Sequence, residues 1–158
     1  MLRTLSQRGG RMSQETLPGL PGSVKEVIFL RLEDGDEIIA KLTEVAEKRG
    51  IKGALVTGIG GVKRAKVGVF SPERGEYEPE YIEGFSELAS LQGNISVLPD
   101  GKLLPHLHVV LGTKKGVVAG HLLEGEVQVT AEIFIIAISQ KLSREIVSQY
   151  GIKLIKDR

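Results

Sequence analysis

Three histidines, His106, His108 and His121, are the residues of this chain with the clearest potential for chemistry. They are the only histidines among 158 residues, and they lie within the stretch LPHLHVVLGTKKGVVAGHLLEG. Imidazole nitrogens are favoured ligands of zinc and similar divalent cations, and three of them leave a fourth coordination position open. The spacing is compatible with such a site. It is also compatible with partly buried histidines that form hydrogen bonds with the backbone or with carboxylates.

The register of a hairpin decides whether the three rings meet. His106 and His108 are two residues apart, so on a strand their side chains share one face and lie about 7 Å apart along the chain. The polar segment GTKKG separates them from His121. If Lys114 and Lys115 form a two-residue turn, His108 lies directly opposite His121 and the three imidazoles converge on one patch.

A three-residue turn closed by Gly116 gives the opposite result. It shifts the pairing by one residue, and such a slip turns His121 to the other face of the sheet. In that register a bulge at Gly120 would restore the convergence. The alternatives therefore predict either a common patch of imidazoles or a third ring turned away from it.

Three glutamates that follow the histidine hairpin, Glu124, Glu126 and Glu132, extend the possible chemistry. Each is a candidate fourth ligand or hydrogen-bond partner of a ligating histidine. A three-histidine zinc with an open position can activate water near neutral pH. Glu132 would then serve as a general base if it lay within hydrogen-bond reach. A metal-dependent enzyme acting on an unknown small molecule is therefore one hypothesis for the function.

The elements that must position these residues begin with a strand and a helix. The segment 24–32, VKEVIFLRL, alternates well enough to predict a strand. A helix is predicted over 36–50 because its apolar residues recur at helical spacing. Asp34 or Asp36 is the predicted N-cap, and Gly50 after Lys and Arg is the predicted stop.

A glycine cluster, Gly58, Gly60 and Gly61, separates two further predicted strands at 51–57 and 65–70. Glycines after a strand are typical of phosphate-binding loops. The dinucleotide fingerprint, however, requires a helix to follow, and here a second strand follows. The cluster therefore predicts a tight turn or a β-bulge.

The second half of the chain reads mostly as strands and turns. Residues 71–84 predict an exposed loop or hairpin, and turns are predicted at 93–94 and 99–101. After the histidines, 127–139 predicts a long buried strand, and the tail predicts a short helical or extended segment before a closing strand at 152–155. About eight strands and one helix indicate an α+β fold, a mainly antiparallel sheet flanked by one or two helices.

Composition limits the function classes. The net charge is +1, from 21 basic and 20 acidic residues, which argues against DNA binding dominated by phosphate contacts. The absence of cysteine excludes disulfides, thiol nucleophiles and cysteine-type zinc sites. No apolar run reaches the roughly 18 residues of a membrane span, so we expect no membrane partner, and the absence of cysteine fits a cytoplasmic location. Residues 1–22 predict a flexible basic tail, followed by one domain over 23–158.

Several segments resemble the plants-and-prokaryotes-conserved (PPC) domain family. HLHVVLG, a short polar turn and GVVAGHLLEGEVQVTAEIFI follow the family's His-x-His strand, its Gly-His-Leu motif and its strand with an Ala-Glu pair. GALVTGIGGVKRAKVGVF resembles the family's early glycine-centred hairpin. EGFSELASLQGNIS resembles its Phe-Glu-Ile-Leu-Ser-Leu-x-Gly segment. The similarity covers about residues 24–155.

The resemblance implies an antiparallel sheet flanked by helices that assembles as a homotrimer. Some members hold a metal at the histidines, which implies zinc or a similar divalent cation at His106, His108 and His121. Plant members join the domain to AT-hooks, and there it mediates self-association and contact with transcription factors. The resemblance thus implies a trimeric candidate DNA-binding or regulatory module, with its own copies and DNA or a transcription factor as partners. The histidines could instead hold the trimer together, with a neighbouring copy supplying the fourth ligand.

Two features depart from the family. RGGR at residues 8–11 lacks the Arg-Gly-Arg-Pro core of an AT-hook, so the hook-based route to DNA is missing. The turn at 112–116 is shorter than the family pattern, which leaves the register of the histidine hairpin open.

Overall fold

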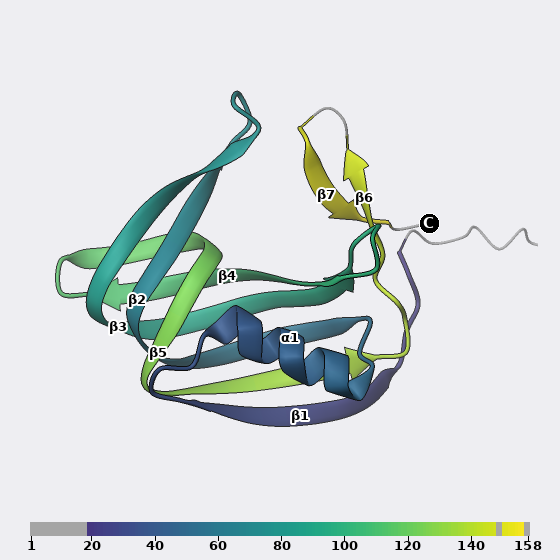
Figure 1. Cartoon of the computed structure of the whole chain (residues 1–158), viewed down its shortest axis with the longest axis horizontal. Coiled ribbons are helices and arrows are strands. Elements are labelled where there is room, and N and C mark those ends of the chain that lie inside the picture. Colours follow the sequence, from purple (N-terminus) through teal and green to yellow (C-terminus); the bar gives the residue numbers. More distant parts are fainter. Residues whose placement is uncertain (1–18, 148–149, 157–158) are drawn as a thin grey trace, which may run out of the picture.

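The fold is an antiparallel sheet with one helix against it and a small hairpin near the C-terminus (Figure 1). The computed structural model describes residues 19–147 and 150–156, so most of the predicted tail lies outside the described residues. The predicted α+β class with a mainly antiparallel sheet is confirmed. The described residues form these elements in chain order: β1 (Val24–Glu33), α1 (Ile38–Arg49), β2 (Ala54–Ser71), β3 (Glu76–Val97), β4 (Leu103–Thr113), β5 (Gly116–Ile138), β6 (Arg144–Val147) and β7 (Ile152–Ile155).

Strands β2 to β5 close into a ring of pairings because β5 is long and changes partners along its length. Its first part, 116–121, pairs with β4, and 121–127 pair with the second half of β2. Its last part, 130–138, pairs with β1 and with the first half of β2. Strand β3 pairs with β2 throughout and with β4 over its second half. The end of β2 and the start of β3, residues 64–71 and 76–83, form an antiparallel hairpin that we call the β2–β3 arm. The ring places β4 and the first part of β5 beside the base of this arm (Figure 1).

Helix α1 covers the face of the sheet that carries the core. Its buried residues are Ile38, Leu42 and Ala46, and the helix packs against β4 and β5. The predicted stop at Gly50 is confirmed, since this residue has φ 64°, a left-handed conformation that glycine adopts without strain. No helix among the described residues is long and apolar enough to cross a membrane.

The N-terminal cap of α1 differs from the prediction. Glu37 is the cap, and its carboxylate accepts a hydrogen bond from the backbone N–H of Ala40 at 2.7 Å. The carboxylate of Asp36 instead accepts from the backbone N–H of Glu33 at 2.9 Å. Asp36 therefore closes the turn before the helix, and the next residue takes over the cap.

The glycine cluster of β2 forms bulges inside one continuous strand. Register shifts occur between Gly58 and Gly60 and between Val62 and Arg64, so the predicted bulge is confirmed. The expected hairpin centred on these glycines is wrong. A Cβ at Gly60 would lie 2.5 Å from the Cα of Ala131, so glycine here permits close approach of two strands.

The turn predicted at Gly93 and Asn94 is also wrong, because both residues lie inside β3. A Cβ at Gly93 would overlap the carbonyl oxygen of His106 on β4 and lie 2.9 Å from the Cα of Leu107. The glycine therefore serves strand packing. The turn at 99–101 and the hairpin within 71–84 are confirmed.

The C-terminal segment forms a separate hairpin of β6 and β7. The predicted strand Ile152–Ile155 is confirmed, but it pairs with β6 and does not close the main sheet. An isolated bridge between Val97 and Ser143 ties the hairpin to β3. The backbone N–H of Val97 also donates to the carbonyl oxygen of Leu142 at 2.7 Å. Because a two-stranded hairpin is only marginally stable alone, these contacts and those of its side chains must hold it in place.

Candidate metal centre

The histidine hairpin has the register that brings the rings together. Thr113 pairs with Gly116 across a two-residue turn, and His108 pairs with His121. The two-residue alternative is therefore confirmed. Along β4 the core face carries buried apolar residues such as Leu107, so the alternation of the strand places His106 and His108 on the opposite face.

The three imidazoles form one cluster. One nitrogen of each ring lies within 4.8 Å of the corresponding nitrogens of the other two. The ring centroids of His106 and His121 are 4.9 Å apart, and those of His106 and His108 are 5.3 Å apart. Rings at this separation can direct their nitrogens toward a single point.

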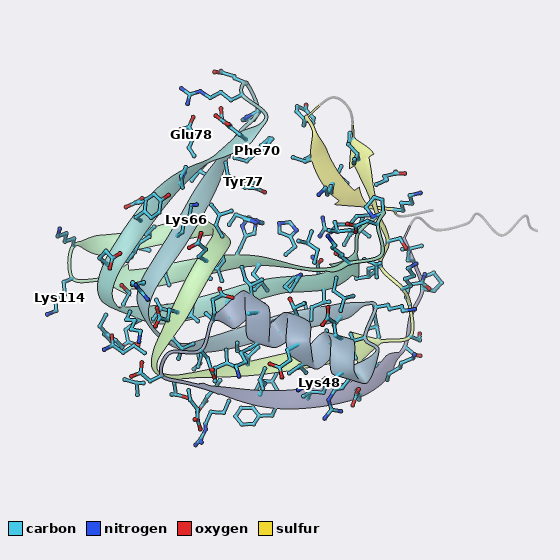
Figure 2. All side chains as sticks on the ribbon, in the orientation of Figure 1. Lys48, Lys66, Phe70, Tyr77, Glu78 and Lys114 are labelled. Atoms are coloured by element: carbon cyan, nitrogen blue, oxygen red, sulfur yellow. The ribbon has the colours of Figure 1, made fainter. Side chains whose placement is uncertain are left out.

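His121 provides the observation that bears most directly on cation binding. Its Nδ1 atom is buried and has no hydrogen-bond partner among the described residues. Buried polar atoms are almost always paired, because an unpaired one loses its hydration without replacement. Tyr77 stacks on this ring at a centroid distance of 4.4 Å and an interplanar angle of 24°. Tyr77 also packs against Phe70, and both belong to the β2–β3 arm (Figure 2).

The arginine of β6 reaches the site from the C-terminal hairpin. Arg144 is 6% exposed, and its Nη2 lies 3.0 Å from Nδ1 of His106. The same Nη2 donates to the Oδ1 of Asn94 at 3.0 Å, and Nε donates to the Oγ of Ser96 at 2.6 Å. Nη1 donates to the carbonyl oxygen of Lys153. One guanidinium thus joins β3, β4, β6 and β7 beside the histidine cluster.

The environment favours neutral imidazoles. Burial lowers the pKa of His106 to about 4, and the charges of Arg144 and His108 act in the same direction. Burial also lowers the pKa of His121 to about 4, with further contributions from the other two histidines and Arg144. A metal ligand must carry a free lone pair, so rings that stay neutral are suited to cation binding.

The residues present fit a divalent cation. The three imidazoles supply the donors, and a cation could contact the buried Nδ1 of His121, which has no hydrogen-bond partner in the described part of the chain. Zinc accepts nitrogen ligands of this kind and commonly keeps one position open in three-ligand sites.

The glutamates proposed from the sequence do not join the cluster, which contains only the three histidines among the described His, Asp and Glu residues. Glu126 forms ion pairs with Lys63 at 2.8 Å and with Arg64. Glu124 lies 3.5 Å from Lys66. Their carboxylates are therefore engaged with cationic side chains of β2.

Glu132 is separated from the cluster by two strands. It pairs with Ile59 of β2, and β3 lies between β2 and the histidine strand β4. Its side chain lines a different hollow, together with Thr57 and Phe134. The role of Glu132 as a general base beside the metal is therefore wrong.

Three residues of the site, Tyr77, Asn94 and Arg144, have no counterpart in the sequence-based prediction. No motif singles them out, because each reaches the histidines through long-range strand pairing. The one available signal was the alternation of β3. Asn94 pairs with His106, which places both side chains on one face once the turn at 93–94 is discarded.

Comparison with known proteins links this arrangement to a family. The model of the Plants and Prokaryotes Conserved domain matches residues 20–139. A crystal structure of a plant- and prokaryote-conserved protein from Pyrococcus horikoshii is 36% identical, with a TM-score of 0.81 over 87% of this chain and 96% of that one.

Two further solved structures bear on the site and on function. A metal-containing protein from Archaeoglobus fulgidus is 32% identical, with a TM-score of 0.81 over 86% of this chain and 96% of that one. A candidate DNA-binding protein from Ralstonia eutropha is 25% identical, with a TM-score of 0.75 over 81% of this chain and 89% of that one. No curated protein matches the chain.

Proposed function

Because the chain belongs to the Plants and Prokaryotes Conserved domain family, we propose that it is a self-associating domain whose three histidines bind zinc or a similar divalent cation. The observation that carries this proposal is the convergence of the three imidazoles, one nitrogen of each lying within 4.8 Å of the others, together with a buried Nδ1 of His121 that has no hydrogen-bond partner among the described residues. The metal-containing relative from Archaeoglobus fulgidus supports it.

The side chains around the cluster would orient the ligands. His106, His108 and His121 would hold the cation, and the stacked ring of Tyr77 would fix the plane of His121. A bound cation with an open position would supply Lewis acidity toward a fourth ligand. The low pKa of His106 and His121 keeps both rings neutral in mildly acidic solution.

Metal analysis and titration of the purified protein test this function. We expect about one zinc per chain and competition between zinc and a coloured chelator. The variant His108→Ala should weaken zinc binding more than about 100-fold, since changes outside the ligand set alone cost about 10–100-fold. Gln92→Ala is the matched control, because Gln92 pairs with His108 across β3 and β4 and is not part of the cluster. Absence of zinc binding by the unaltered protein would refute the proposal.

An exposed apolar face supports the homotrimer. Phe29, Phe134, Thr57, Gln92 and His108 form one cross-strand row, each residue paired with the next. The phenyl rings of Phe29 and Phe134 pack at 5.2 Å but remain 55% and 44% exposed. Exposed apolar patches commonly mark association surfaces.

The neighbouring row on this face begins with three apolar residues. Val27, Ile136 and Leu55 continue through Asn94 to His106. The exposed face therefore leads directly to the histidine cluster. A second copy placed on it would lie beside the metal site, where it could also supply a fourth ligand.

Duplex DNA is the second candidate partner, favoured by the relative from Ralstonia eutropha that is described as a candidate DNA-binding protein. Many basic side chains of this chain are paired with carboxylates, including Arg49 with Glu26 and Lys63 with Glu126. Few phosphate contacts are therefore expected, so the affinity for duplex should fall only shallowly with salt. A salt titration of binding by fluorescence anisotropy measures this slope. Undetectable binding at low salt would remove DNA as a partner.

A further inference from the structure

The contact between Arg144 and His106, as it stands in the structure, conflicts with cation binding by His106. A guanidinium only donates hydrogen bonds, so the Nδ1 of His106, 3.0 Å away, must accept. A neutral imidazole has one protonated and one unprotonated nitrogen. His106 therefore carries its proton on Nε2 while this contact lasts.

Neither nitrogen of His106 then has a lone pair free for a cation. Ligating histidines normally donate their second ring N–H to an acceptor such as a carboxylate or a carbonyl oxygen. Arg144 is a donor and a cation, so it opposes ligation through both its hydrogen bond and its charge. His121 is in the opposite condition, since its Nδ1 has no partner among the described residues.

The other contacts of the guanidinium allow it to leave the ring without leaving the site. Its Nη2 already donates to Asn94, its Nε to Ser96, and its Nη1 to the carbonyl oxygen of Lys153. These three acceptors lie on β3 and β7 and do not depend on His106. A small rotation of the guanidinium can therefore free the imidazole while Arg144 stays anchored.

We propose that Arg144 is a positioning residue that holds His106 in a non-ligating tautomer, so that cation binding requires release of this ring by the guanidinium. The inference rests on the proposed function, because it assigns a metal-binding role to His106. It makes the affinity of the site depend on a residue of the C-terminal hairpin. Arg144 thereby sets the cation concentration at which the third ligand becomes available.

The first test reads the tautomer directly. Long-range ¹H–¹⁵N correlation spectra of the metal-free, ¹⁵N-labelled full chain distinguish a protonated Nε2 from a protonated Nδ1. Without zinc, we expect His106 to be protonated on Nε2. When zinc is added, we expect either that the proton moves to Nδ1 and Nε2 becomes the ligand, or that Nδ1 loses its contact with Arg144. A metal-free protein with His106 protonated on Nδ1 would overturn the proposal without any variant.

The second test removes the donor. Arg144→Met keeps an unbranched side chain and should increase the affinity for zinc about tenfold, a change of the size that groups around ligands produce. Arg144→Lys keeps a cationic donor and should stay near the original affinity. Arg64→Met is the matched control, because Arg64 is paired with Glu126 away from the histidines and is equally charged.

The outcomes separate the two proposals. If the unaltered protein binds zinc but Arg144→Met binds it no more tightly than Arg64→Met does, the role of Arg144 is wrong and the metal site stands. If the unaltered protein binds poorly and Arg144→Met binds well, the role of Arg144 is supported. If no variant binds zinc, the metal function fails, and the inference fails with it.

Discussion

The three imidazoles of the cluster converge, yet their neighbours differ. His106 contacts a guanidinium, whereas His121 stacks on Tyr77 and its Nδ1 has no hydrogen-bond partner within residues 19–147 and 150–156. Burial lowers the pKa of both rings to about 4 from the ordinary value of 6.5. Between about pH 4 and pH 6.5, these histidines are mostly neutral in the folded protein and mostly protonated in the unfolded chain. The folded state therefore binds fewer protons than the unfolded chain in this range.

The metal-free protein should therefore lose stability as the pH falls from about 6.5 to about 4. The sign follows because protons bind preferentially to the unfolded chain in this window, while the full contribution is present above pH 6.5. Unfolding by urea in the presence of a chelator, repeated at several pH values, measures the effect. His121→Gln should flatten the slope and Gln92→Ala should leave it unchanged. A stability that is constant between pH 6.5 and 4.5 would contradict the prediction.

Among the elements, the contact between β3 and β4 controls the position of the histidines. Gly93 lies against the backbone of His106 and Leu107, so any side chain there would push β4 away. The same pair of strands contains Gly112, where an added Cβ would meet its nearest atom at an ordinary 3.6 Å. The two glycines thus differ in the space available although they share one strand pair.

Gly93→Ala should cost about 1–3 kcal/mol or more of unfolding free energy, because the overlap is with backbone that cannot rotate away. It should also weaken zinc binding, since His106 would shift with its strand. Gly112→Ala should change stability by no more than about 0.5 kcal/mol. Chemical denaturation of both variants provides the measurement. Equal stabilities would show that β4 can yield at Gly93.

Local patterns predicted several of these elements correctly. The stop at Gly50 and the turn at 99–101 follow from residue types that act over a few positions, whereas the pairing of His108 with His121 is one of two registers that the sequence left open. The errors at Gly58–Gly61 and Gly93 have a common physical cause. Glycine is required both in turns and where two strands approach closely, and the chain alone does not distinguish these uses.

For the whole molecule, the main feature is the apolar face that continues into the histidine cluster. Phe29, Leu55, Ile59 and Phe134 are about half exposed on it, while α1 covers the opposite, core-facing side. Contacts between elements that are distant in the sequence also explain what the sequence could not predict. Arg144 reaches His106 across 38 positions, and such contacts depend on how complete elements fold back on one another.

Phe134→Glu should dissociate the proposed trimer, because the new carboxylate would be buried without a partner in each interface. Light scattering coupled to gel filtration should then report the mass of a monomer in place of a trimer. Ala40→Glu is the control, as it adds the same charge to the exposed side of α1. A Phe134→Glu variant with the mass of the unaltered protein would show that copies associate through another surface.

His108 is exposed and stands at the end of the row that begins at Phe29. Copies that associate through this face would screen the rings from bulk solvent. The rate at which a bound ion leaves would then depend on protein concentration. Dilution would separate the copies and expose the ion to competing ligands in solution.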